Sequence, residues 1–161
     1  MLAKVDVKLI WTEYHAIVNN GAVYRYGGKP AYDKSPDEIT GADCSGILAY
    51  LLHRGSHGLI NLPEGSQDQR DVLEHSGNHQ IVNYGDIAEA DESRIFVHYI
   101  RPGYHGTGSI GHTFLTNKPH FHTKARSIEA HGPEGCQIGS RDWDYPTLLR
   151  EWYSGYELLT I

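Results

Sequence analysis

The pattern of apolar residues changes halfway along this chain of 161 residues, and this change limits the possible folds more than any other feature. In the first half, apolar residues recur three and four positions apart, as on the buried face of a helix. In the second half they form short runs separated by Gly or Pro, as in strands joined by tight loops. Helices followed by strands predict an α+β fold, with the N-terminal helices packed on an antiparallel sheet.

The helical signals define three segments in the first half of the chain. Residues 5–19 have apolar side chains at helical spacing and predict the first helix. The second is expected to begin at Asp43, a residue type that favours the N-cap position. The third is expected to begin at Ser66, which would form a capping box with Gln69.

The second half contains five short apolar runs that predict strands. They span residues 95–100, 110–116, 125–131, 136–140 and 156–161. No linker rich in Pro, Gly or Ser divides the chain. We therefore expect residues 1–161 to form a single domain, because 161 residues is an ordinary length for one domain.

Charge and hydropathy exclude several functional classes. The 14 basic and 20 acidic residues give a net charge of −6, whereas binders of nucleic acid or anionic membranes are usually basic. No apolar stretch approaches the length of a transmembrane helix, and the charged N-terminus does not have the pattern of a signal peptide. We expect no nucleic-acid partner and no membrane association.

The tetrapeptide DCSG, residues 43–46, is the most informative motif. If Asp43 caps a helix, Cys44 lies in the first turn, where unpaired backbone N–H groups and the helix dipole favour a thiolate. A cysteine in such a position is a candidate nucleophile. Gly46 would allow another backbone or a substrate to approach closely. The simpler alternative is that Cys44 is a small buried apolar residue, as most free cysteines are.

The order of motifs resembles the NlpC-like family of cell-wall cysteine peptidases. YRYGG (24–28) followed by DCSG (43–46) resembles the segment that carries the family's nucleophile. The other matching segments are SQDQRDVLEHSG (66–77), YGDIAEA (84–90), GHTF (111–114) and IEAHGPEGCQIGS (128–140). The resemblance implies a papain-like α+β domain that cuts the peptide stems of bacterial peptidoglycan.

The resemblance also implies a catalytic triad. Cys44 is the implied nucleophile, and His112 the implied base and acid. The third position falls on Glu129, where the family more usually has a histidine; this resembles lysin domains of actinobacterial phages. His131 lies two residues further, on the same strand face, and is the alternative partner of His112. A carboxylate would orient the imidazole and stabilise its charged form, so Glu129 is favoured.

Three residues near the nucleophile are implied to bind substrate. Tyr26 matches a family tyrosine that contacts the substrate amine, and Asp43 and Ser45 match positions that contact substrate. The simpler roles are a loop aromatic for Tyr26 and a helix cap for Asp43. The backbone N–H of Cys44 is expected to stabilise the oxyanion.

Eleven histidines make a zinc-dependent cell-wall hydrolase the first alternative. Three pairs have spacings that suit zinc, namely His53 and His57, His75 and His79, and His120 and His122. However, the first two pairs straddle glycines that should end their helices, and the third has no convincing upstream partner. We therefore expect no metal and no organic cofactor. A non-catalytic module that binds the cell wall is the second alternative.

The second cysteine, Cys136, is expected to be a buried apolar residue on a strand and not to form a disulfide with Cys44. Taken together, the motifs predict an endopeptidase that cuts peptidoglycan stems with a Cys-His-Glu or Cys-His-His site. Peptidoglycan would be its partner, and a monomer is expected. A phage lysin or tail-associated protein is the expected context, either released from the host cytoplasm at lysis or carried on the virion.

Overall fold

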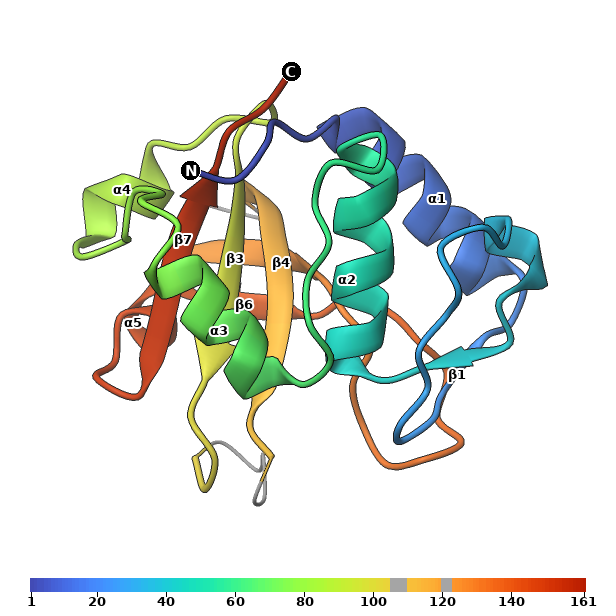
Figure 1. The fold of residues 1–161 in the computed structure, drawn as a ribbon. Coiled ribbons are helices and arrows are strands. Elements are labelled where there is room, and N and C mark those ends of the chain that lie inside the picture. Colours follow the sequence, from blue (N-terminus) through green and yellow to red (C-terminus); the bar gives the residue numbers. More distant parts are fainter. Residues whose placement is uncertain (105–109, 120–122) are drawn as a thin grey trace.

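The computed structural model describes residues 1–104, 110–119 and 123–161, which fold around a five-stranded antiparallel sheet (Figure 1). The strands follow the order β6-β5-β4-β3-β7. Their bounds are β3 (Ile95–Ile100), β4 (His112–Pro119), β5 (Lys124–Ile128), β6 (Asp142–Asp144) and β7 (Tyr153–Leu158).

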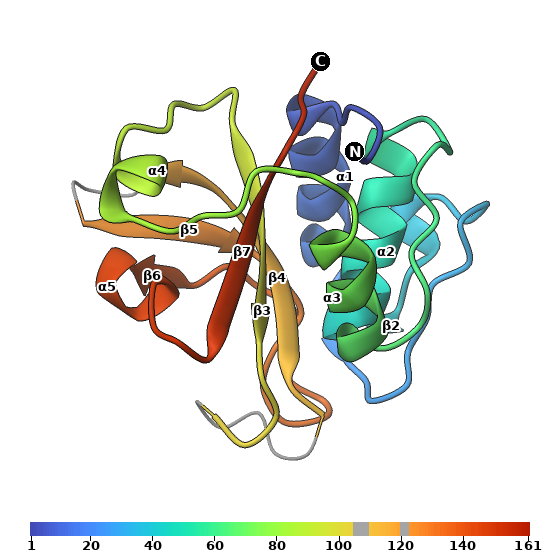
Figure 2. The same ribbon diagram turned by 60° about the vertical axis from the view of Figure 1, so that its left-hand side comes forward.

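Three helices cover one face of this sheet: α1 (Val7–Asn19), α2 (Cys44–Gly55) and α3 (Ser66–Glu74). Figure 2 shows them together on one side of the sheet. In Figure 1, α2 lies next to β4, which it contacts directly. Buried residues of α1 and α2 form one hydrophobic cluster with Val97 and Leu115 of the sheet. The predicted α+β fold, a papain-like arrangement of helices on an antiparallel sheet, is therefore confirmed.

The opposite face of the sheet has a core of its own, because side chains alternate between the two faces of a strand. Phe96, Phe114 and Trp143 belong to this second cluster. Two short helices, α4 (Tyr84–Ala88) and α5 (Tyr145–Leu148), contribute to it. Aromatic side chains therefore cover the face of the sheet opposite the three helices, next to the strands whose ends carry His112 and Glu129.

The starts of the helices confirm that Asp43 precedes α2 and that α3 begins at Ser66, but they correct the predicted capping box. Asp43 caps α2, and its Oδ1 accepts a hydrogen bond of 2.7 Å from the backbone N–H of Gly46. The capping box predicted at Ser66 is wrong, because Gly65 is the N-cap of α3 and the Ser66 hydroxyl donates to the carbonyl of Ile110. Gln69 is fully buried, and its amide donates to the carbonyls of Ser45 and Pro63 instead.

Only the strand at 95–100 keeps its predicted bounds. The strands predicted at 110–116, 125–131 and 156–161 exist with shifted ends, as β4, β5 and β7. The strand predicted at 136–140 is not part of the sheet. Its residues instead lie beside β1 (Val23–Tyr24), which itself pairs in parallel with β2 (Gly41–Ala42). The predicted sheet lacked β6, which pairs with β5.

Cys136 is exposed, so the prediction of a buried apolar residue was wrong. The physical reason is the local backbone, in which Gly132 and Gly135 adopt positive φ angles of 101° and 89° and turn the segment over the surface. Neither cysteine takes part in a disulfide.

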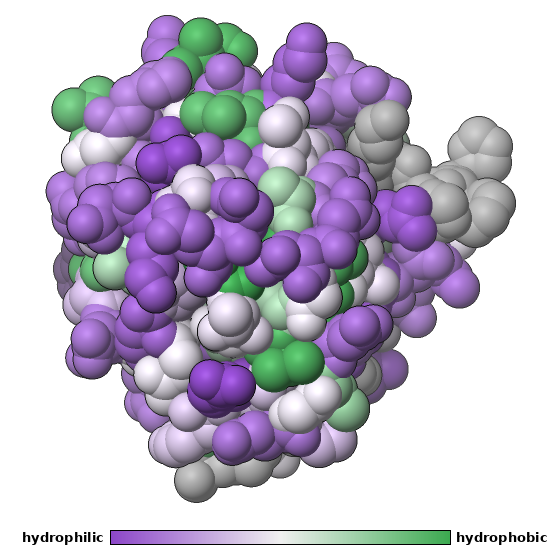
Figure 3. Space-filling model, turned by 90° about the vertical axis from the view of Figure 1, so that its right-hand side faces the viewer, coloured by the Kyte–Doolittle hydropathy of each residue, from purple (hydrophilic) through white to green (hydrophobic). Residues whose placement is uncertain are grey.

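The molecular surface on the side of α1 is mainly hydrophilic, with apolar residues scattered singly or in small groups (Figure 3). Across the ranges that the structure describes, no helix combines the length and the apolar character needed to cross a bilayer.

Candidate active site

The two glycine motifs of the N-terminal half pack against each other at the start of α2. A Cβ atom added to Gly46 would lie only 2.2 Å from the carbonyl oxygen of Gly28, so no other residue fits there. That same carbonyl accepts a hydrogen bond of 3.0 Å from the backbone N–H of Asp43. The expected close approach at Gly46 is therefore confirmed, and it fixes Cys44 in the first turn of α2.

The structure brings the three predicted triad residues together. His112 begins β4, and Glu129 directly follows β5, the neighbouring strand. His112 Nε2 lies 2.9 Å from Glu129 Oε1, and Cys44 lines the same hollow, close enough to the imidazole to raise the pKa of His112. Since Glu129 engages Nε2, the nitrogen available for the thiol is Nδ1. This arrangement suits a nucleophile, a proton carrier and an orienting carboxylate.

Glu129 has no exposed side-chain surface, and three side chains donate hydrogen bonds to its carboxylate. His112 and Arg141 share Oε1, with Arg141 donating from Nε at 3.1 Å and also from Nη2. Trp143 Nε1 donates to Oε2 at 2.8 Å. The buried charge is thus paired and well solvated by protein groups, as a buried carboxylate requires.

Arg141 and Trp143 were not among the predicted site residues. They lie two residues apart, so they project from the same face of the chain, and Trp143 belongs to β6. A basic and an aromatic residue two positions apart form the sequence pattern that could have indicated these site residues. Without β6 in the predicted sheet, nothing placed them next to Glu129.

Burial and pairing act in opposite directions on the two charged partners. Burial by itself lowers the pKa of His112, but the interactions with Cys44 and Glu129 outweigh it and raise that pKa to about 9. Burial by itself raises the pKa of Glu129, but His112 and Arg141 hold it well below its usual range. The site therefore favours a charged imidazole beside a charged carboxylate.

An aromatic stack supports the imidazole from the sheet side. The ring of His112 stacks on Phe114 with centroids 5.3 Å apart, and Phe114 stacks on Trp143 at 4.5 Å. His98, which is fully buried, stacks on Phe114 at 5.1 Å. Close packing of this kind restricts the rotation of His112.

His131, the alternative third residue, lies half-buried beside the triad. Burial lowers its pKa, and the nearby Arg141 guanidinium lowers it further. The carboxylate that holds His112 belongs to Glu129, whereas His131 lines the adjoining hollow.

Cys44 lies where two surface hollows meet. One, of about 410 Å³, is lined by His112, His131 and Trp143. The other, of about 530 Å³, is lined by Tyr26 and by the Asp43 and Ser45 pair. An extended chain passing through both hollows would present its backbone to the thiol.

The three predicted substrate-binding residues all lie at the second hollow. Tyr26 is 64% exposed and so is available to a ligand. Asp43 caps α2, which is the simpler role predicted for it. Asp43 and Ser45 are both bound by Lys29, a residue that no sequence motif marks.

Comparison with known proteins gives weak similarity. No protein-family model matches the chain, and no curated protein sequence matches it. The P60 domain of an antigen from M. avium subspecies paratuberculosis is similar in structure, with a TM-score of 0.46 and 18% identity over 94% of this chain and 97% of that chain. A mutated form of the resuscitation promoting factor interacting protein RipA gives a TM-score of 0.43 and 15% identity over 98% of this chain and 71% of that chain. Function must therefore be argued from the site itself.

One histidine of each of the first two pairs that suggested a zinc enzyme has another partner. His53 stacks on Tyr32 with centroids 4.0 Å apart, and its Nδ1 lies 2.9 Å from Asn61 Oδ1. His79 faces Asp86 at 3.5 Å. In the described ranges no group of three or more His, Cys, Asp or Glu side chains is arranged to hold a metal ion. His120 and His122 lie outside these ranges.

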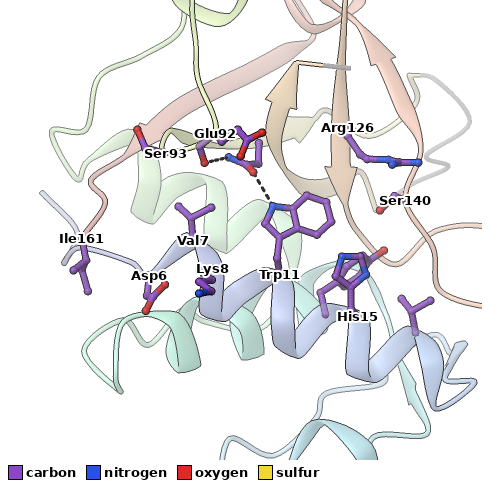
Figure 4. Close-up of a pocket in the computed structure, with 13 residues that line it drawn as sticks. Asp6, Val7, Lys8, Trp11, His15, Glu92, Ser93, Arg126, Ser140 and Ile161 are labelled. Atoms are coloured by element: carbon purple, nitrogen blue, oxygen red, sulfur yellow. Dashed lines mark hydrogen bonds between the residues drawn. The ribbon is translucent and has the colours of Figure 1, made fainter. Parts of the chain in front are cut away.

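A larger hollow, of about 870 Å³, lies between α1 and the sheet (Figure 4). Trp11 is its main aromatic side chain; it donates from Nε1 to Asn117 Oδ1 at 2.7 Å and stacks on His15. None of the predicted site residues lines it. Size alone therefore does not identify the candidate active site, whereas the Cys44–His112–Glu129 chain of contacts does.

Proposed function

We propose that this protein is a cysteine endopeptidase of the NlpC-like type that cuts the peptide stems of peptidoglycan. The observation that supports it most is the contact chain from Cys44 through His112 to the buried Glu129. The ordered sequence motifs supply the substrate class, because they resemble those of cell-wall peptidases.

The reaction begins with a thiolate at Cys44 and a charged imidazole at His112. The Cys44 sulfur attacks the carbonyl carbon of the scissile amide, and the resulting oxyanion lies near the backbone N–H of Cys44 in the first turn of α2. His112 then gives its proton to the leaving amine as the C–N bond breaks.

Water completes the cycle. His112, now neutral, takes a proton from a water molecule that attacks the thioester carbonyl, and the C–S bond breaks to release the acid and the thiolate. Glu129 remains ionised throughout and keeps Nε2 of His112 protonated and correctly oriented. No step requires a metal or an organic cofactor.

The decisive experiment is digestion of purified peptidoglycan by the wild type and by Cys44→Ala, with the released fragments identified by mass spectrometry. Cys136→Ser is the matched control, since it removes the other thiol without touching the site. We expect wild-type activity in Cys136→Ser, none in Cys44→Ala, and no effect of a chelator. Full activity in Cys44→Ala, or loss of activity on chelation alone, would refute the cysteine mechanism.

We further propose a phage context, either a lysin released from the host cytoplasm or a tail-associated enzyme. The likeness of the Glu129 segment to actinobacterial phage lysins supports it. Purified protein added to actinobacterial cell walls should lower their turbidity, while walls with unrelated stem chemistry should resist. Equal lysis of both would argue against this context.

A further inference from the structure

The hollow beside Cys44 has a lysine ammonium built into its wall. Lys29 Nζ lies 2.7 and 2.6 Å from the two carboxylate oxygens of Asp43, and 2.6 Å from the hydroxyl of Ser45. The Lys29 side chain is 28% exposed and that of Asp43 only 9%. Both residues line the hollow, and Lys29 is the more exposed partner of the pair.

Asp43 has no capacity left for a second cation. Besides Lys29, its carboxylate accepts hydrogen bonds from the backbone N–H groups of Gly46 and Gly27, at 2.7 and 3.1 Å. The Ser45 hydroxyl also donates to it, at 3.2 Å. Because Lys29 contacts both oxygens, these groups make five contacts to a carboxylate that offers about four lone-pair positions.

The charged side chains that line the hollow determine which ligands it attracts. Glu64 and Asp68 line the same hollow, so without Lys29 its walls would carry three carboxylates and would attract an ammonium. Lys29 pairs with Asp43, the carboxylate next to Cys44 in the chain, so an ammonium that approached this carboxylate would meet a like charge, whereas Glu64 and Asp68 keep the rest of the lining acidic.

We infer that Lys29 determines specificity by excluding substrates that carry a free amine at this end of the hollow. The substrates that fit are stem peptides whose first residue is acylated, as it is where the stem remains attached to the glycan, rather than free peptides with a charged N-terminus. This inference rests on the proposed function, and it narrows the substrate to intact peptidoglycan.

Paired synthetic stem peptides test it. The two peptides have one sequence and differ only in a free or an acetylated N-terminal amine. Binding is measured by calorimetry on a Cys44→Ala background, so that the result does not depend on turnover. We expect the wild-type hollow to favour the acetylated peptide by at least about tenfold.

Variants at Lys29 separate charge from shape. Lys29→Gln keeps a hydrogen-bond donor for Asp43 but removes the charge, so the preference should vanish or reverse. Lys29→Arg keeps the charge and should keep the preference. Lys34→Met, an exposed lysine of the same loop, is the matched control and should behave as the wild type.

The outcomes are distinct. A wild-type preference for the free amine, no binding of either peptide, or an unchanged preference in a folded Lys29→Gln protein would overturn the inference. The wild-type measurement stands even if Lys29→Gln does not fold. Selective binding without any hydrolysis by the protein carrying Cys44 would instead refute the proposed function and leave the role of Lys29 intact.

Discussion

Glu129 combines complete burial with a full negative charge, which makes it the most demanding residue of the chain. Its three donors come from β4, from β6 and from the residue just before β6. A carboxylate buried this way is stable only with such partners. Together these partners hold a charged carboxylate directly beside the His112 imidazole.

Glu129→Gln should abolish most activity. The neutral amide keeps the size of the side chain but no longer stabilises the charged imidazole, so kcat should fall by about 10²–10⁴-fold, as when a triad carboxylate is neutralised. His131→Ala, which alters only the wall of the hollow, should lose less than about tenfold. Hydrolysis of one stem peptide by both variants measures this. If only His131→Ala were inactive, the third position would belong to His131.

Arg141→Met tests the other partner of the carboxylate. Removing the guanidinium takes away one of the contacts that lower the pKa of Glu129. We expect a loss of about 1.5–3 kcal/mol in the free energy of unfolding, the range for a hydrogen bond to a charged group, because the Arg141 side chain is 38% exposed and His112 and Trp143 remain as partners of Glu129. Urea denaturation measures it. Arg126→Met, an exposed arginine of β5, is the control and should change stability by less than about 0.5 kcal/mol.

Among the elements, the start of α2 tolerates the least change. The carbonyl of Gly28 occupies the space that a side chain at Gly46 would need. Gly46→Ala must therefore push the Gly28 loop away from the helix start, at a cost of about 1–3 kcal/mol, and displace Cys44 from His112. Thermal unfolding and peptide hydrolysis should both show the loss.

Gly139→Ala is the matched control for this effect. A Cβ atom at Gly139 would meet nothing within 4 Å, and its backbone does not require glycine. The melting temperature and activity should stay near those of the wild type. Equal destabilisation by the two alanines would show that the close approach at Gly46 is not what positions the nucleophile.

Local signals predicted the elements well where the elements depend on local interactions. Asp43 caps α2 because its own side chain reaches the next turn, and a sequence shows this directly. Gln69 shows the limit, since its amide is drawn into the core by carbonyls that lie outside its own helix. The segment at 136–140 pairs with β1 rather than with the sheet, and apolar spacing does not reveal the partner of a strand.

The complete chain should lose stability as the pH rises from neutral to alkaline. The pKa of His112 is about 9 in the folded protein and about 6.5 in an unfolded chain. The His112 imidazole therefore holds a proton in the folded protein that it releases in the unfolded chain. Counted for His112 alone, the stabilising effect of this proton is full below pH 6.5 and lost as the pH passes 9. The free energy of unfolding should fall by at most about 1.4 kcal/mol per pH unit across this window.

His112→Gln provides the comparison for this dependence. Glutamine does not titrate, so its unfolding free energy should be flatter between pH 6.5 and 9. Chemical denaturation at several pH values measures both proteins. Parallel slopes would mean that His112 does not bind the additional proton. At acidic pH both proteins should weaken as Glu129, whose pKa is lowered by folding, is forced to take up a proton.

The candidate site, like the fold, was predictable from the sequence only where local motifs mark its residues. Cys44, His112 and Glu129 lie within motifs whose order resembles a known family, so their proximity could be expected from the amino-acid sequence alone. Lys29 and Arg141 carry no motif, and their roles depend on which side chains the fold places opposite them. Long, flexible basic residues are common on protein surfaces, so only tertiary contacts distinguish these two.

The helix that carries the nucleophile also separates it from both chain termini. α2 has 12 residues, so Cys44 lies about 17 Å from Gly55, whose carbonyl accepts a hydrogen bond from Asp6. Val5 pairs in turn with Thr160, so the two ends of the chain meet there, as Figure 1 shows. A short peptide could therefore join the termini while new ones are opened in a surface loop. Such a circular permutant would leave the Cys44 end of α2 untouched, and a cargo fused at residue 1 or residue 161 would lie away from the candidate active site.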